Sequence, residues 1–254
     1  MHASAAIALL AAVSMLPVGN VGAEEIKVLA SVGIKAALDE LVPRFERATG
    51  HDVTAAFDLA SVLRASIDGG EPFDVAILTP PLLDELVASG AVAAGSRSPV
   101  ARVGLGLMVR GGAAKPDVSS VESFERALLD ARSVTYATAG ASGVAFVATV
   151  EALGIADEVL AKARPAASPE EVSANVIGGL ADVAVLPVSE ILPVAGAELG
   201  GVFPADVQTY VVMAAGIAVQ STRPSAAREL ISFLLSPAND DVIEASGMQR
   251  VPRE

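Results

Sequence analysis

After residue 24 the chain alternates short apolar runs with longer stretches in which apolar residues recur at helical spacing. The short runs predict buried strands, and the spaced stretches predict the helices between them. The first part of the chain thereby predicts strands over 26–30, 53–57 and 73–78, and helices over 34–50, 59–67 and 79–90. We expect Pro43 to kink or shorten the first helix. Strands and helices in this order form a mainly parallel sheet covered by helices on both faces.

The pattern changes at Arg102, where a long apolar run over 103–109 contains two glycines and predicts a strand that crosses between two lobes. A second set of strands and helices follows, and the apolar run over 207–219 predicts a return crossover. The second set consists of strands over 133–137 and 182–186 and helices over 121–129, 142–153 and 168–178. Two last helices, over 224–235 and 237–245, then cover the first lobe.

The first 23 residues form an apolar leader without lysine, arginine, aspartate or glutamate. Its core is too short to span a bilayer, and Val21-Gly22-Ala23 has the small-x-small form of a signal-peptidase site. We therefore expect a cleaved signal peptide at 1–23 and a periplasmic protein, the alternative being a frayed alanine-rich tail. The expected domains are one lobe at 24–103 plus 214–254 and a second lobe at 104–213, with no further membrane-spanning run.

Composition excludes several classes of protein. The chain has no cysteine, which excludes thiolate catalysis, disulfides and a lipid-anchoring cysteine. Acidic residues outnumber basic ones by 30 to 17, and the net charge of −13 argues against binding nucleic acid. The same acidic balance favours a freely diffusing monomer.

Several segments of the chain resemble the periplasmic substrate-binding proteins of ABC importers, and the molybdate-binding type in particular. The resemblance rests on the first strand and on the segments 37–41, 45–50, 73–77 and 86–90, and it extends to the segment 236–248. It implies a periplasmic-binding-protein fold of type II, with two α/β lobes joined by two crossover strands and a small anion held between them by hinge closure. It also implies delivery to an ABC permease in the inner membrane, with no cofactor.

The turns that follow strands are the expected ligand contacts. Backbone N–H groups at such turns, together with the positive ends of the following helices, bind anions without a basic side chain. The candidate positions in these turns are Ser31, Val32, Gly33, Ala60, Ser61, Ser142, Gly143 and Pro187. The alternative is that Ser31, Ser61 and Ser142 are ordinary helix N-caps.

The resemblance to the molybdate type breaks down at three of these positions. Gly33 and Ala60 stand where that type has serines, and Pro187 stands where it has a tyrosine, while Ser142 adds a hydroxyl. The ligand is then either a molybdate-like oxyanion or, given these losses, an organic carboxylate, with Ser31, Arg102 and Tyr210 as a further donor set for the carboxylate. The alternative is that Arg102 is a solvated strand end and Tyr210 is packed in the crossover.

Enzyme motifs are absent from the sequence. Beyond the leader His51 is the only histidine, predicted at the surface, and no nucleophile elbow, zinc motif or phosphate loop occurs. We therefore expect a binding protein with no catalytic residues and no metal site. Two alternatives stay open: a secreted two-lobed enzyme that acts on a small organic acid with carboxylate catalysis, and a ligand-sensing partner of a membrane receptor.

Overall fold

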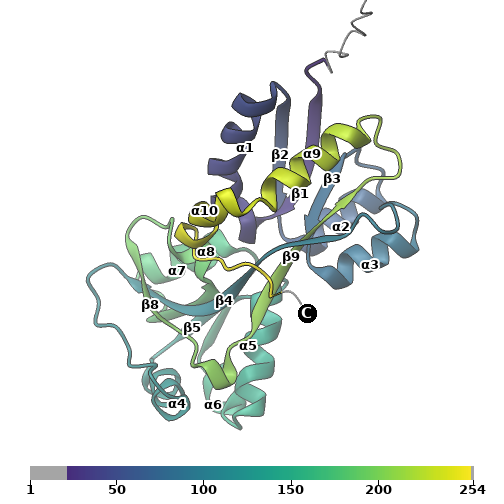
Figure 1. Cartoon of the computed structure of the whole chain (residues 1–254). Helices are drawn as coiled ribbons and strands as arrows, with labels where there is room; N and C mark the ends of the chain where they lie inside the picture. The colour runs from purple at the N-terminus through teal and green to yellow at the C-terminus, as the bar shows by residue number, and fades with distance from the viewer. Residues whose placement is uncertain (1–21, 253–254) are drawn as a thin grey trace, which may run out of the picture.

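The computed structural model describes residues 22–252, so nearly all of the predicted signal peptide lies outside the described residues. Nine strands of this part of the chain form one mixed sheet in the order β2-β1-β3-β9-β4-β7-β5-β6, with β8 paired to β4. The sheet is parallel toward its two ends and antiparallel where β9 and β4 cross its middle. The mixed α/β architecture predicted from the sequence is therefore present (Figure 1).

The first group of strands consists of β1 (Glu25–Ser31), β2 (Asp52–Asp58) and β3 (Val75–Leu78), which run parallel. A 3-10 turn, η1 (Val32–Ile34), leads from β1 into α1. The helices that connect these strands are α1 (Lys35–Thr49), α2 (Ala60–Asp68) and α3 (Pro80–Ala88). The predicted βαβαβα unit is confirmed by this order.

Two long strands join the halves of the molecule. In β4 (Ser98–Arg110) the residues up to Gly104 pair with β9 (Tyr210–Ile217), and those from Leu105 onward pair with β7 (Val183–Pro187). β9 also pairs with β3, so that it lies between β3 and β4. Figure 1 shows β4 and β9 running from the upper to the lower part of the fold.

The second group of strands comprises β7, the parallel pair β5 (Val134–Ala137) and β6 (Ala163–Ala166), and β8 (Ala197–Val202). Its helices are α4 (Val121–Asp130), α5 (Ala141–Ala152), α6 (Ala156–Ala161), α7 (Pro169–Ile177) and the short α8 (Val188–Ile191). The pattern of the sequence does not predict β6, β8, α6 or α8. The two strands contain charged residues with proline or glycine and are not apolar runs, and the two helices are only four and six residues long.

The end of the described chain returns to the first group. Helix α9 (Pro224–Leu234), the 3-10 turn η3 (Pro237–Asn239) and α10 (Asp240–Ala245) pack on α1. Phe233 contacts Phe45 edge to face, with ring centroids 5.5 Å apart. This packing buries Phe45 and Leu41 on either side of Pro43, and α1 continues to Thr49 without being shortened. Of the two effects expected of Pro43, the shortening is therefore wrong, because tertiary burial outweighs the hydrogen bond lost there, and the kink stays a prediction.

No helix within residues 22–252 combines the length and the apolar character needed to cross a membrane.

Candidate functional site

The carboxyl ends of four strands meet at one cavity of about 180 Å³. β1 ends at Ser31 and β3 ends just before Thr79, while β5 ends at Ala137 and β7 at Pro187. In open α/β sheets ligands bind outside the carboxyl ends of the strands, because the following helices begin there. We call this cavity the cleft cavity. Its lining residues are Ser31, Val32, Leu59, Ala60, Ser61, Thr79, Leu82, Ala137, Ala139, Gly140, Ala141, Ser142, Val144, Pro169, Pro187, Glu190, Val211 and Met213.

Four hydroxyl groups line the cleft cavity without a hydrogen bond to another described residue: those of Ser31, Ser61, Thr79 and Ser142. Ser31 and Thr79 stand at N-cap positions, but neither side chain caps its helix. Ser61 and Ser142 lie inside the first turns of α2 and α5, one residue past the start. The interpretation of Ser31, Ser61 and Ser142 as ordinary N-caps is therefore wrong, and these hydroxyls are free to contact a ligand.

Two helices point their N-terminal turns at the cleft cavity from opposite groups of strands. α2 begins at Ala60 and α5 begins at Ala141, and both residues line the cavity. The first N–H groups of a helix have no partner within the helix, and the helix dipole places positive charge there. The arrangement thus supplies donors for an anion from both sides.

Glu190 is the one charged side chain among the described residues that line the cleft cavity. It is partly buried in α8, and no described residue forms a hydrogen bond or an ion pair with its carboxyl group. Burial raises the pKa of Glu190 to about 8, and repulsion from Glu170 adds to the shift. Glu190 also lines a neighbouring cavity of about 250 Å³ between α1 and α7, which includes Lys35 and Glu170.

The structure brings six of the ten predicted ligand contacts together at the cleft cavity. These are Ser31, Val32, Ala60, Ser61, Ser142 and Pro187. Gly33 and Gly143 do not line the cleft cavity, and neither position has space for a side chain. A Cβ atom on Gly33 would lie 2.6 Å from Met213 Cε, and one on Gly143 would lie 1.9 Å from the carbonyl oxygen of Ala137.

Arg102 and Tyr210 lie outside the lining of the cleft cavity, on the crossover strands. The guanidinium of Arg102 stacks over the Tyr210 ring at 4.1 Å from its centroid and donates a 3.2 Å hydrogen bond to Gln249. The backbone of Arg102 also pairs with that of Gln249. Both side chains therefore have structural partners, and their role as ligand contacts stays a prediction.

Several residues that line the cleft cavity are not among the predicted ligand contacts. Thr79 follows a strand as Ser31 does, so the rule that selected the other turns applies equally to it. Glu190 and Met213 reach the cavity through tertiary packing of α8 and β9. Only the folded chain shows which way these two side chains face.

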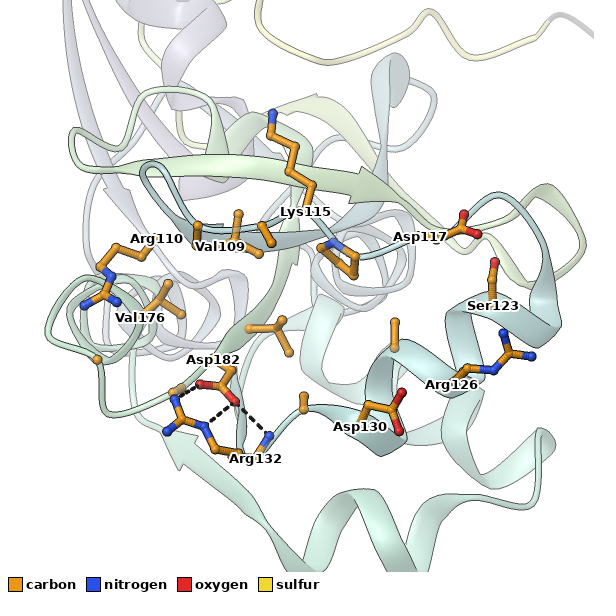
Figure 2. Close-up of a pocket in the computed structure, with 18 residues that line it drawn as sticks. Val109, Arg110, Lys115, Asp117, Ser123, Arg126, Asp130, Arg132, Val176 and Asp182 are labelled. Atoms are coloured by element: carbon orange, nitrogen blue, oxygen red, sulfur yellow. Dashed lines mark hydrogen bonds and ion pairs between the residues drawn. The ribbon is translucent and has the colours of Figure 1, made fainter.

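A larger cavity of about 720 Å³, which we call the outer cavity, lies at the opposite end of β5 and β7 (Figure 2). Three of its four basic side chains are already paired with carboxylates, whereas Arg110 has no such partner in the described chain. Arg132 donates to Asp182 at 2.6 Å, Arg126 to Glu122 at 2.8 Å, and Lys115 contacts Glu198 at 3.2 Å. The hydrogen bond from Arg132 lowers the pKa of Asp182. An anion entering here would have to displace these partners.

His51 is buried at the other end of β1 from Ser31, which corrects its predicted surface position. Its Nδ1 accepts a 3.1 Å hydrogen bond from the backbone N–H of Glu24, and its ring stacks on Phe45. These contacts give His51 a structural role away from the cleft cavity. In the part of the chain described, no three histidine, aspartate or glutamate residues gather into a metal-binding group.

Comparison with known proteins places these features in a family. The family described as "Bacterial extracellular solute-binding protein" matches residues 26–249. The chain is 34% identical to a protein named "Aconitate isomerase" from Pseudomonas sp over 233 residues, which are 89% of this chain and 88% of that protein. It is 25% identical to "Molybdate-binding protein ModA" of Azotobacter vinelandii, over 89% of this chain and 90% of the relative.

The solved structure of the Azotobacter vinelandii periplasmic molybdate-binding protein superimposes with a TM-score of 0.76 at 22% identity. The match covers 90% of this chain and 100% of the molybdate-binding protein. The periplasmic-binding-protein fold expected from the sequence is confirmed by this similarity.

Proposed function

Because this chain belongs to the bacterial extracellular solute-binding proteins, we propose that it captures a small organic acid in the cleft cavity and delivers it unchanged to an ABC permease. The proposal includes the predicted lobes, 24–103 plus 214–254 and 104–213, which close on the ligand by bending β4 and β9. It also includes export through a signal peptide at 1–23. The ligand is anionic, and the protein acts as a monomer.

The observation that carries this proposal is the mixed lining of the cleft cavity. The unengaged hydroxyls of Ser31, Ser61 and Ser142 and the N-termini of α2 and α5 suit carboxylate oxygens. Apolar side chains line the same cavity, and they suit a carbon skeleton but offer nothing to a tetrahedral metal oxyanion. The apolar side chains are Val32, Leu59, Leu82, Val144, Val211 and Met213.

The comparisons support an organic acid over molybdate. The relative at 34% identity carries the name of an enzyme for a tricarboxylic acid, whereas the molybdate-binding relative is 25% identical. The missing side chain at Gly33 and the missing N–H at Pro187 point the same way, because a tetrahedral oxyanion is held by many donors.

A panel of anions tests the proposal. We expect cis-aconitate, trans-aconitate and citrate to raise the melting temperature in a saturable way, with one ligand bound per chain by titration calorimetry. Molybdate, tungstate and sulfate should have little effect. Stabilisation by molybdate alone would overturn the assignment to organic acids. An Arg102→Ala variant tests the remaining prediction that Arg102 and Tyr210 contact the ligand.

A second candidate function is isomerisation of an unsaturated organic acid. It is favoured by the 34% identity to aconitate isomerase over most of both chains, and by the carboxyl group of Glu190 inside the cleft cavity. A buried carboxyl with a pKa near the ambient pH is suited to proton transfer. The test is to incubate a large excess of cis-aconitate with the protein and to separate the products. Recovery of unchanged cis-aconitate supports the binding protein, and conversion to trans-aconitate supports the isomerase.

A further inference from the structure

The cleft cavity lacks a basic side chain among its described lining residues, and Glu190 is the only ionisable group there. An ionised Glu190 would therefore face an anionic ligand with no compensating cation beside it. A neutral carboxylic acid has an O–H donor and would add to the hydroxyl groups of the cavity. The protonation state of Glu190 thus decides whether the group repels the ligand or binds it.

We propose that Glu190 enters the ligand complex as a neutral carboxylic acid that donates a hydrogen bond to an anionic oxygen of the ligand, so that ligand capture and protonation of Glu190 are coupled. This inference rests on the proposed capture of an organic anion in the cleft cavity. It adds a donor and a pH-dependent control of affinity to that site.

The position of Glu190 supports this role. Its carboxyl group occupies the space beside Gly33, where a Cβ atom would lie 3.3 Å from Glu190 Oε1. The neighbouring Ser189 is anchored, because its hydroxyl donates a 2.6 Å hydrogen bond to the carbonyl oxygen of Gly33. The start of α8 is thereby fixed against η1, and the Glu190 side chain is held at the cleft cavity.

Glu190 also has a route for its proton. It lies on the wall shared by the cleft cavity and the cavity between α1 and α7, because it lines both. The second cavity is lined in part by exposed residues, among them Lys35 and Glu170. The proton can therefore exchange with solvent through the second cavity while a ligand fills the first.

The charges around Glu190 favour its neutral form. Lys35 and Asp39 of α1 and Glu170 of α7 are the charged side chains of the described chain that share a cavity with Glu190. Lys35 is paired with Asp39 at 2.5 Å, which leaves Glu170 as the uncompensated neighbour. Among the described lining residues, α2, α3, α5, β7, β9 and η1 contribute no charged side chain. Desolvation and repulsion from Glu170 together keep the pKa of Glu190 near 8.

The coupling predicts a defined pH profile. When only the neutral form binds, the apparent dissociation constant is the intrinsic one divided by the neutral fraction, so it rises roughly tenfold between about pH 6 and about pH 9. trans-Aconitate is a suitable probe, because it remains an anion across this range. Calorimetry in buffers of different ionisation enthalpy should show uptake of about half a proton per trans-aconitate near pH 8.

Glu190→Gln is the decisive variant, because the amide keeps a donor but does not titrate. We expect it to bind trans-aconitate near pH 6 within a few-fold of the parent and to lose both the pH profile and the proton uptake. Glu170→Gln is the matched control. It removes a repelling neighbour, so the profile should remain and move to lower pH. An unaltered pH profile in Glu190→Gln, or a flat profile in the parent, would overturn the inference.

A ligand-free measurement separates this inference from the proposed function. In protein labelled with carboxyl-¹³C glutamate, one NMR signal should titrate with a midpoint near pH 8 and should be missing in Glu190→Gln. An NMR titration midpoint in the ordinary range of glutamate would contradict the inference even if trans-aconitate binds. If none of the probes binds at any pH, the proposed function fails, whatever the NMR midpoint. Should Glu190→Gln fail to fold, the parent's proton uptake and NMR midpoint decide alone.

Discussion

The cleft cavity and the outer cavity lie at opposite ends of β5 and β7 and differ in charge as well as in size. The outer cavity is larger, about 720 Å³ against about 180 Å³, and has four basic residues in its lining, three of them paired with carboxylates. The cleft cavity has no basic residue in its described lining, but its hydroxyl groups and helix N-termini have no partner. The proposed anion site is therefore the cavity whose donors have no partner, and not the cavity that is larger and has more cations.

The largest expected effect comes from the helix that carries Ser142 into the cleft. In Gly143→Ala the new methyl group would lie 1.9 Å from the carbonyl oxygen of Ala137. Because that oxygen belongs to the backbone, α5 has to move away from β5. We expect a loss of about 2 kcal/mol of stability, or roughly 4 to 8 °C in melting temperature, and a loss of binding to trans-aconitate.

Gly140→Ala is the matched control for this prediction. A Cβ atom on Gly140 would meet its nearest neighbour, the Ala137 side chain, at an ordinary 3.6 Å, and the backbone φ of −85° suits alanine. Thermal melts of both variants compare the two glycines directly. Equal stability of the two variants would show that α5 is not seated against β5 as described.

A smaller effect is expected from a single donor of the cleft cavity. Ser142 is 5% exposed, and Ser142→Ala removes a hydroxyl that has no partner within the described chain. A hydrogen bond to a charged ligand contributes about 1.5 to 3 kcal/mol, so the affinity for trans-aconitate should fall at least about tenfold. The melting temperature of the ligand-free protein should hardly change.

Arg126→Gln tests the outer cavity in the same way that Ser142→Ala tests the cleft cavity. Arg126 lies in the outer cavity and is exposed, with Glu122 as its partner. Its removal should leave the affinity for trans-aconitate unchanged, as measured by the same calorimetry. If Arg126→Gln weakens binding and Ser142→Ala does not, the ligand binds in the outer cavity and the assignment of the cleft is wrong.

The sequence predicts the turns of the cleft well, because the position of a turn follows from local patterns. Ser31, Ser61 and Ser142 each follow a strand and open a helix, and parallel strands bring such turns to one edge of the sheet. The same patterns predict the crossover strands, since β4 and β9 are long apolar runs. They miss β6 and β8, because β6 contains an arginine and a proline and β8 contains a glutamate and two glycines, so neither is an apolar run.

Glu190 shows why the rest of the site could not be predicted. The pattern of the sequence does not predict α8, the short helix that carries Glu190, and acidic residues are usually exposed. Gly33 and Glu190 come together only in the folded chain, where a Cβ atom on Gly33 would lie 3.3 Å from Glu190 Oε1. His51 was mispredicted for the same reason, because Phe45 and Glu24 enclose it only in the folded chain.

The smallest expected effect concerns the ion pair of the outer cavity. Asp182→Asn removes the charge and one of the two acceptor oxygens of a carboxylate that accepts two side-chain hydrogen bonds and one backbone hydrogen bond from Arg132. Arg132 is largely exposed, and exposed ion pairs contribute little, so the melting temperature at neutral pH should fall by at most about 2 °C. The affinity for trans-aconitate should stay the same.

The difference in melting temperature between the parent and Asp182→Asn should also depend on pH. Arg132 lowers the pKa of Asp182 in the folded protein, so the pair adds stability above the pKa of unfolded aspartate, about 3.9. As the pH falls through the lowered pKa, Asp182 takes up a proton and that stability is lost. The gap in melting temperature between the parent and Asp182→Asn should therefore close in acid. A gap that persists in acid would mean that Asp182 acts through packing rather than through its charge.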